Sequence, residues 1–269
     1  MHNDTRSIRC SDRELFYLSA LIGGETLLGV RDPFPGWLIE EIQDAMTDVQ
    51  RALSERKVIT IQPRGVVVAD KDVEALVSVV ALCDAMLITT LATSRQEAWQ
   101  RTFYFKGATA VELASAEGNE EYSISQLDGQ VESIAEEIAS WWKLANQPAA
   151  EGKPIRTEEN VLTQARHLTV GQGANNALDY LVGTGISKDS ARPLAETFAS
   201  ASKNGVVVML RRRVSAWQTG SVGMLESNNG LWHLRSFDQA GQAMIECIPC
   251  SAPMLRAELR NLFAHFARS

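Results

Sequence analysis

The chain has 269 residues, of which 45% are hydrophobic, so it can bury a substantial core and is not expected to be disordered. Its formal charge of -7, from 26 Lys and Arg against 33 Asp and Glu, opposes binding to nucleic acids and to anionic membrane surfaces. Because no apolar run approaches the roughly 20 residues that span a bilayer, and the first residues are polar with no signal peptide, the sequence predicts a cytoplasmic protein.

In the first part of the chain, capping residues and apolar spacing predict helices followed by strands. A capping box at Ser11 and Glu14 starts the first helix. Apolar residues at three- and four-residue steps predict an amphipathic helix over 37–57, and Asp70 caps another over 71–84. Four strands rich in β-branched and aromatic residues and one further helix follow, at 86–92, 99–105, 108–114, 121–125 and 131–141.

The Pro- and Ala-rich segment 146–156 is predicted to be a linker, after which the same kinds of element return. Helices are expected at 158–167 and 174–181, and a third is expected to stop at Asn204-Gly205. Four strands and a closing helix complete the chain, at 206–213, 221–227, 231–237, 244–248 and 255–266.

The order of these elements indicates that one structural unit occurs twice. Ala-Trp-Gln stands at a predicted strand at both Trp99 and Trp217, an offset of 118 positions (217 minus 99), and both parts share the order helix, four strands, helix. We therefore predict an internally duplicated α+β fold with two similar halves, each an antiparallel β-meander flanked by helices. The halves are 1–145 and 157–269, with the linker 146–156 between them, quasi-two-fold related and packed as one compact unit. A chance match between two unrelated α+β segments is the alternative.

Cys247-Ile-Pro-Cys250 is the most enzyme-like tetrapeptide, because two thiols at this spacing can form a redox disulfide or half of a zinc site. Redox motifs, however, lie at a helix N-terminus after the first strand of a βαβ unit, whereas this one ends a predicted meander strand. The residues that could complete a zinc site show no ligand spacing: Cys10, Cys83, His233 and His265. Four scattered cysteines also make no disulfide scaffold, so we expect small buried thiols in a reducing compartment.

The other short motifs do not converge on a site. Gly-x-Gly at 171–173 and at 183–185 follows no predicted strand and lacks a Gly-Lys-Ser/Thr ending, which favours helix boundaries. Adjacent acids are typical of solvated helix faces, and the basic run 211–213 alternates sides on a strand. The large aromatic residues at strand positions are interpreted as packing residues: Trp99, Phe103, Phe105 and Trp217. No catalytic, cofactor-binding or metal-ligating residue is assigned.

Two helices, DKDVEALVSVVAL (70–82) and KDSARPLAETFASA (188–201), precede strand-rich stretches, AMLITTLATSRQEAWQRTFYFKGATAVEL (85–113) and GVVVMLRRRVSAWQTGSVGML (205–225). This layout, with a closing helix, resembles the EspG family, the cytosolic chaperones associated with type VII (ESX) secretion systems. The resemblance covers nearly the whole chain and rests on no sharp motif. It implies a non-enzymatic chaperone or adaptor that binds a small helical secreted protein of the PE-PPE type, keeps it soluble until export and needs no cofactor.

Two other classes of function stay open. An enzyme could have its site assembled between the two halves, which predicts a deep pocket with clustered ionisable groups and a bound small molecule or metal. A structural or regulatory module could self-associate through its sheets, and a homodimer is left open on the same ground. Partner capture would favour the chaperone, and concentration-dependent mass in light scattering would favour the self-associating module.

Overall fold

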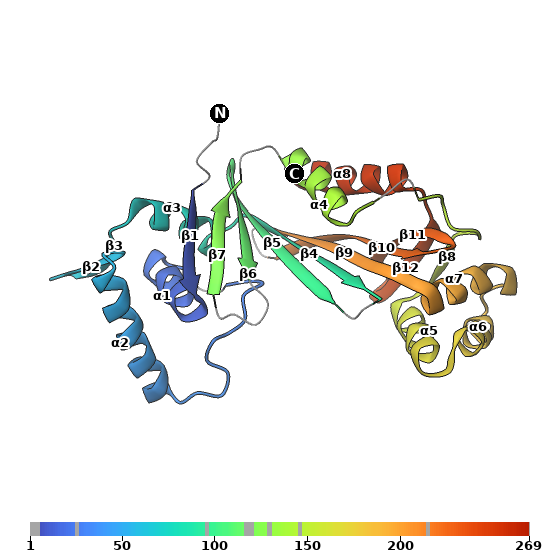
Figure 1. Ribbon diagram of the computed structural model, residues 1–269, viewed down its shortest axis with the longest axis horizontal. Helices are drawn as coiled ribbons and strands as arrows, with labels where there is room; N and C mark the ends of the chain where they lie inside the picture. The colour runs from blue at the N-terminus through green and yellow to red at the C-terminus, as the bar shows by residue number, and fades with distance from the viewer. Residues whose placement is uncertain are drawn as a thin grey trace. The chain divides into compact units, whose positions relative to one another are not determined.

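The computed structural model describes residues 6–24, 27–94, 97–115, 121–127, 131–144, 147–213 and 216–268, and has an α+β fold (Figure 1). Spatial contacts divide the chain into two compact units. Unit 1 consists of Met1–Ile88, Arg101–Gly129 and Leu210–Gln218, and unit 2 of Thr89–Gln100, Gln130–Met209 and Thr219–Ser269. The predicted halves 1–145 and 157–269, with the linker 146–156, divide the chain along the sequence, whereas these units are defined by spatial contacts. The predicted division therefore stays a prediction.

Unit 1 contains three helices among its described residues and most of the first set of strands. Its elements are β1 (Ser7–Ser11), α1 (Asp12–Ile22), α2 (Ile39–Glu55), β2 (Ile59–Gln62), β3 (Gly65–Val68), α3 (Lys71–Ala81), the start of β4 (Ala85–Thr93), most of β5 (Ala98–Lys106), β6 (Thr109–Ser115) and β7 (Glu121–Gln126). Its strands follow the order β1-β7-β6-β5-β4-β9, with the last residues of β9 (Ala201–Arg212) included. β2 and β3 form a separate antiparallel hairpin.

The predicted helix caps of unit 1 are present. Ser11 Oγ accepts from the Glu14 amide at 3.1 Å, and the Ser11 amide donates to Glu14 Oε2 at 3.0 Å, so both halves of the capping box exist. Asp70 Oδ1 accepts from the amides of Asp72 and Val73 at 2.9 and 3.1 Å. These bonds satisfy amides that a helix leaves unpaired in its first turn, which explains why α1 and α3 begin where the sequence predicts.

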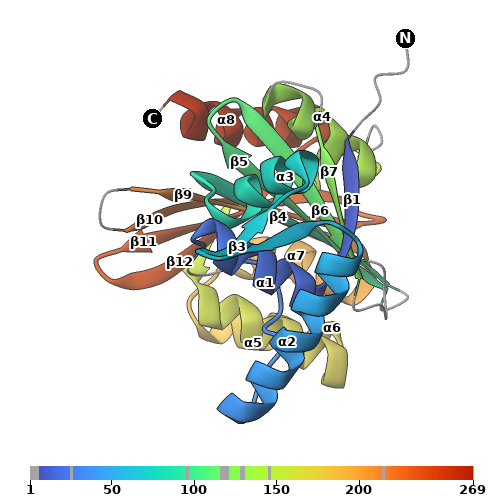
Figure 2. The same ribbon diagram turned by 90° about the vertical axis from the view of Figure 1, so that its left-hand side faces the viewer.

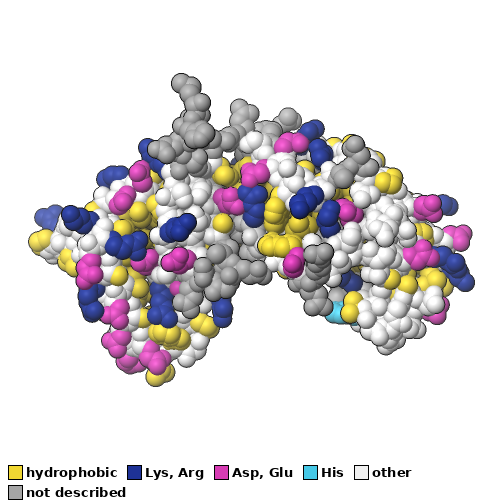
Figure 3. Space-filling view, viewed as in Figure 1, with side chains coloured by type: hydrophobic (Ala, Val, Ile, Leu, Met, Phe, Trp, Pro, Cys, Tyr) yellow, Lys and Arg dark blue, Asp and Glu magenta, His cyan; other side chains and the backbone are white. Residues whose placement is uncertain are grey.

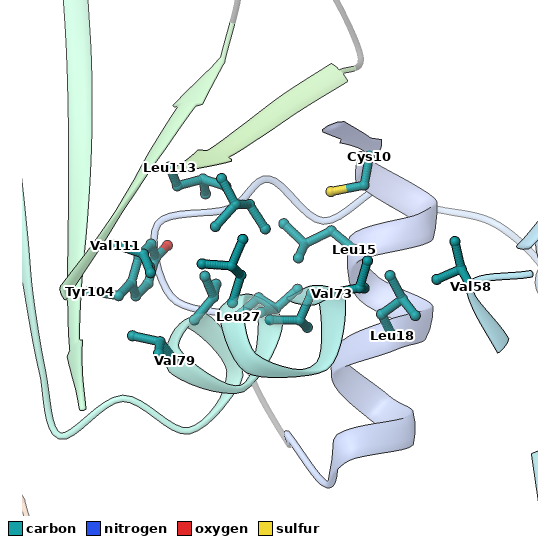
Figure 4. Packing of buried hydrophobic residues seen from close by; sticks show 14 of the residues in the cluster. Cys10, Leu15, Leu18, Leu27, Val58, Val73, Val79, Tyr104, Val111 and Leu113 are labelled. Carbon is teal, nitrogen blue, oxygen red and sulfur yellow. The ribbon is translucent and has the colours of Figure 1, made fainter. Parts of the chain in front are cut away.

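The core of unit 1 lies between α1, α3 and the strands. Leu15 and Leu18 from α1 meet Val73 and Val79 from α3, and β5 and β6 close the cluster from the sheet (Figure 4). Within unit 1, α1 and α3 lie on one face of its strands (Figure 2). Burial of this apolar stripe, at three- and four-residue spacing, is what holds both helices on the sheet.

Unit 2 contains the remaining helices and the second set of strands. Its elements are the end of β4, the start of β5, α4 (Val131–Trp141), β8 (Ile155–Glu158), α5 (Glu159–Gln172), α6 (Ala174–Gly183), α7 (Lys188–Ser200), most of β9, most of β10 (Trp217–Ser227), β11 (Gly230–Gln239), β12 (Gln242–Pro249) and α8 (Ala252–Arg268). Its strands follow the order β4-β9-β10-β11-β12-β8. α4 and α8 lie on one face of these strands, and α5, α6 and α7 lie on the other (Figure 1).

The predicted helix stop at Asn204-Gly205 is wrong, because α7 ends at Ser200 and both residues belong to strand β9. Gly205 is needed in the strand for another reason. A Cβ atom at this position would lie 2.8 Å from Trp142 Cε2, so only glycine lets the ring pack directly on the strand backbone. A glycine that admits a close neighbour and one that ends a helix are indistinguishable in sequence.

The predicted linker is partly built into unit 2. The Ala150 amide donates to the Leu231 carbonyl at 3.2 Å, and the Leu231 amide donates to the Pro148 carbonyl at 3.2 Å. β8 then pairs antiparallel with β12, as β1 pairs with β7 in unit 1. The first strand of each part therefore joins the last strand of its meander. This shared order agrees with an internal duplication, which stays a prediction.

Candidate protein-binding groove

A groove of about 320 Å³ lies in unit 2 between α5 and the strands that α5 only partly covers. It is lined from α5 by Glu159, Leu162, Thr163 and Arg166, from α7 by Phe198, and from the strands by Asn204, Val206, Val208, Ser221, Gly223, Leu225, Leu234, Ser236 and Ile245. α5 stands on its apolar residues, with Leu162 and Ala165 buried and Arg166 exposed. The charged side chains of this helix therefore stand at the rim and the apolar ones face the floor.

The floor of the groove is apolar because β9 is apolar on both of its faces. Val207 and Met209 are 0% and 3% exposed, on the same face as Gly205 and the Trp142 ring. Val206 and Val208 point to the opposite face, since side chains alternate along a strand, and there they are only half-buried. One face of β9 is thus fully covered within unit 2, and the other leaves apolar surface that a partner could cover.

Small side chains keep the floor of the groove low. A Cβ atom at Gly223 would come within 3.0 Å of Leu234 Cβ, so the position beside Leu234 stays empty of side chain. Ser221, on the same strand as Gly223, and Ser236, on β11, are also small. The hollow above these residues therefore follows directly from the sequence of β10 and β11.

The groove continues into a second hollow of about 560 Å³. The two share Glu159, Val208, Ser221 and Ser236, and the second adds Phe237 and Asp238. The Arg156 guanidinium lies 4.4 Å from the centroid of the Phe237 ring, a cation-π contact between β8 and β11. An apolar floor with a polar and charged rim is typical of protein-protein interfaces. Because the two hollows are continuous, the groove is long enough to take apolar side chains from one face of a helix.

The two thiols of Cys247-Ile-Pro-Cys250 are assigned to different layers of unit 2. Cys247 belongs to β12 and packs with Leu225 and Trp232, on the sheet face that α7 covers. Cys250 follows β12, and burial, followed by the negative charge of Glu258 on α8, raises the pKa of its thiol. Residues three apart in an extended chain point to opposite sides, so these thiols belong to different layers of unit 2. Both are free and buried.

We expect all four thiols to resist alkylation in the native protein. Burial raises the pKa of Cys10, Cys247 and Cys250 to about 12 and that of Cys83 to about 11, so at about pH 8 the reactive thiolate is scarce. Labelling with a thiol reagent, followed by mass spectrometry, should find no modified cysteine before denaturant is added and four afterwards. Rapid native labelling of Cys247 or Cys250 would contradict this arrangement.

His233 is buried on the sheet face opposite the groove. It is 4% exposed, and its Nε2 atom has no hydrogen-bond partner within the described part of the chain. Burial lowers the pKa of His233, while Glu258 of α8 and Glu246 of β12 act in the opposite direction and Arg235 adds to the lowering. The neutral imidazole is therefore the form that the folded state favours.

From this pKa we expect the free energy of unfolding to fall as pH falls below about 6.5. The unfolded chain binds a proton at its ordinary His pKa, whereas folded His233 binds it only at lower pH, so acid favours unfolding. Urea denaturation between about pH 8 and pH 5.5 should show that the free energy of unfolding of the parent falls by up to about 1.4 kcal/mol per pH unit. His233→Gln should abolish this contribution to the pH dependence. His167→Gln, at an exposed position on α5, should keep the parent's slope. Equal slopes in parent and His233→Gln would contradict the expectation.

The other motifs singled out in the sequence lie apart from the groove. Gly173 and Gly185 follow the ends of α5 and α6 with φ of 89° and 93°, as helix-boundary glycines do. The Arg212 amide donates to the Asp84 carbonyl within unit 1. Phe103 and Phe105 are buried packing residues, as predicted, whereas Trp99 and Trp217 are 38% and 37% exposed. The side chain of His265 lies outside the described residues.

Two general properties of the described residues bear on function. No group of three or more His, Cys, Asp or Glu side chains among them is arranged to hold a metal ion. Within the same residues, no helix has the length and apolar character needed to cross a membrane.

The fold described above is an α+β fold in which antiparallel strands have helices on their faces. It is the fold of a type VII secretion chaperone, EspG5 of Mycobacterium tuberculosis, solved in complex with a PE25-PPE41 dimer. The two chains superpose with a TM-score of 0.64 over 97% of this chain and 96% of EspG5, at 12% sequence identity. The likeness confirms the fold implied by the EspG resemblance.

Other comparisons add nothing to the fold. No family model matches the chain, and no curated protein matches it. A second solved structure, the dehydratase domain from the CurK module of curacin polyketide synthase, has a TM-score of 0.09 at 9% identity, with 91% of each chain covered, which carries no argument.

Proposed function

We propose that this chain is a non-enzymatic secretion chaperone or adaptor that binds an apolar helical segment of a secreted, PE-PPE-like partner in the groove of unit 2. Its role would be to keep that partner soluble in the cytoplasm until export. The observation that carries the proposal is the half-covered apolar floor of Val206 and Val208 in a chain that shares the EspG5 fold. EspG5 itself was solved with a PE25-PPE41 dimer.

The chemistry of the groove supports a protein partner over a small reactive substrate. The floor combines Val, Leu and Ile side chains with small or uncharged polar residues, and the charged residues of the lining, Glu159 and Arg166, stand on one helix at the rim. Such a surface can exclude water around apolar side chains and orient a helix through its rim, which is how apolar helices are recognised in grooves. A general acid-base pair or an activated nucleophile would require a different set of side chains.

The test is to purify the tagged full chain from its native cells and to identify co-eluting proteins by mass spectrometry. A stoichiometric, small, helical protein is expected. Hydrogen exchange on the purified complex should then show slower exchange of β9, β10 and α5 amides than in the free chain. A partner that leaves those amides unprotected would refute the groove, and a co-purified metal or small molecule without a protein partner would favour the enzyme.

A further inference from the structure

Helix α2 of unit 1 carries an apolar stripe that its own unit covers only in part. Its apolar residues alternate at three- and four-residue steps, the spacing of a helix-pairing seam: Ile39, Ile42, Met46, Val49 and Leu53. Val49 and Leu53 are 8% and 1% exposed, whereas Ile42 and Met46 are half-buried and Ile39 is 71% exposed. The covered end adjoins α1 and β2, and the uncovered N-terminal end is the one away from the β2-β3 hairpin (Figure 1).

Aromatic residues extend the uncovered end of the stripe. Phe34 packs edge-on against Phe16 and Trp37, with ring centroids 5.8 and 5.5 Å apart, and the Arg13 guanidinium lies 4.8 Å from the Trp37 ring. Phe16 and Trp37 remain 37% exposed, and Leu38 is 65% exposed. We call the exposed and half-buried apolar residues at this end the α2 patch: Phe16, Trp37, Leu38, Ile39, Ile42 and Met46. Its aromatic part is held in place by these contacts.

The charge beside the α2 patch is predominantly negative, although Arg13 lies on the Trp37 ring and Arg51 pairs with Asp48 at 3.0 Å. Between residues 37 and 50 the sequence has four acids and no Lys or Arg, and the acids are Glu40, Glu41, Asp44 and Asp48. All four are exposed, and acidic side chains gather along α2 in the face shown in Figure 3. A second copy of α2, or an anionic lipid surface, would bring like charges together. A helix whose apolar stripe is flanked by Lys and Arg matches both the seam and the charge.

We propose that the α2 patch is a docking surface for a positively charged amphipathic helix of a partner protein. This surface belongs to unit 1 and is separate from the groove of unit 2, so it adds a second binding function to the proposed chaperone. Trp37 and Leu38 anchor the apolar side of the partner helix, and the acids of α2 contact its basic flanks. The attraction between charges makes the affinity fall with added salt.

The test uses the full chain and two fluorescent synthetic peptides of about 18 residues, long enough for helices. Both carry Leu in the seam, and their flanking positions are Lys in one peptide and Glu in the other. Fluorescence anisotropy should show the Lys peptide binding at least about tenfold more tightly than the Glu peptide, a difference of about 1.4 kcal/mol. The double variant Leu38→Ser with Ile39→Ser should weaken binding of the Lys peptide at least about tenfold.

Two controls separate this surface from other sites. Val170→Ser, at an exposed apolar position of unit 2, and Val208→Glu in the groove should both leave binding of the Lys peptide unchanged. Equal binding of the two peptides, or unaltered binding by the double variant, would overturn the proposal. Two further results would overturn it. If the parent forms dimers in sedimentation and the double variant does not, the patch serves self-association. If the parent binds phosphatidylglycerol vesicles and the double variant does not, the patch serves a membrane.

Discussion

Val208→Glu is expected to reduce the affinity for the helical partner at least about 100-fold, or about 2.7 kcal/mol. Val208 lines both hollows of the groove, so a carboxylate there would be buried by any partner that fills either one. A buried charge without a partner costs far more than a lost apolar contact. The free chain should still fold because Val208 is only half-buried before binding, so the carboxylate can reach solvent. Calorimetric titration with the co-purified partner would measure the change.

Val170→Glu is the matched control for this result. It makes the same substitution in the same unit at a side chain that is 85% exposed and does not line the groove. Its affinity should equal that of the parent, and its thermal unfolding should stay within a few degrees of the parent, since exposed substitutions cost about 0.5 kcal/mol or less. Thermal unfolding of Val208→Glu should show that this variant is still folded at the temperature of the titration. If Val208→Glu binds normally, or if both variants lose binding alike, the partner does not occupy the groove.

The helices and most strands could be predicted because their signals are local. The capping box at Ser11 and the stripe of α2 each depend on residues a few positions apart, and both are present in the structure. β1 and β8 were missed because they are short outer strands whose partners, β7 and β12, are far along the sequence. Gly205 misled the prediction because its reason, the Trp142 ring, comes from another element.

The groove could not be predicted, although its floor is visible as the run Val206-Val207-Val208. A continuous apolar run indicates a strand covered on both faces. Whether the face of Val206 and Val208 is covered depends on the position of α5, which the apolar run itself does not determine. The one local sign is the row of small residues, Ser221, Gly223 and Ser236, which leaves space above the sheet. For Cys247 and Cys250 the motif is easy to recognise in the sequence. The alternation of side chains along an extended chain, however, directs the two thiols to different sides.

Trp232→Ala is expected to destabilise the protein by about 3–5 kcal/mol, a large part of the about 5–15 kcal/mol that holds a typical domain folded. Trp232 is 0% exposed and its Nε1 donates to Thr197 Oγ1 at 3.1 Å, which joins β11 to α7. A Cβ atom at Gly152 would lie 3.2 Å from the Trp232 ring, so the ring also supports the segment before β8. Truncation would leave a cavity where three parts of unit 2 meet. Chemical denaturation would measure the loss.

Trp217→Ala is the control, because Trp217 is also a tryptophan on a strand but is 37% exposed. Trp217 is the tryptophan of the second Ala-Trp-Gln. Its removal should cost about 1 kcal/mol or less, since an exposed side chain leaves no closed cavity. Comparable losses for the two variants would mean that Trp232 is not the anchor of unit 2. Trp232→Ala is expected to cost more than Trp217→Ala because a side chain stabilises the fold through the area that it buries. Trp232 buries its whole ring, although it lies outside the repeated Ala-Trp-Gln.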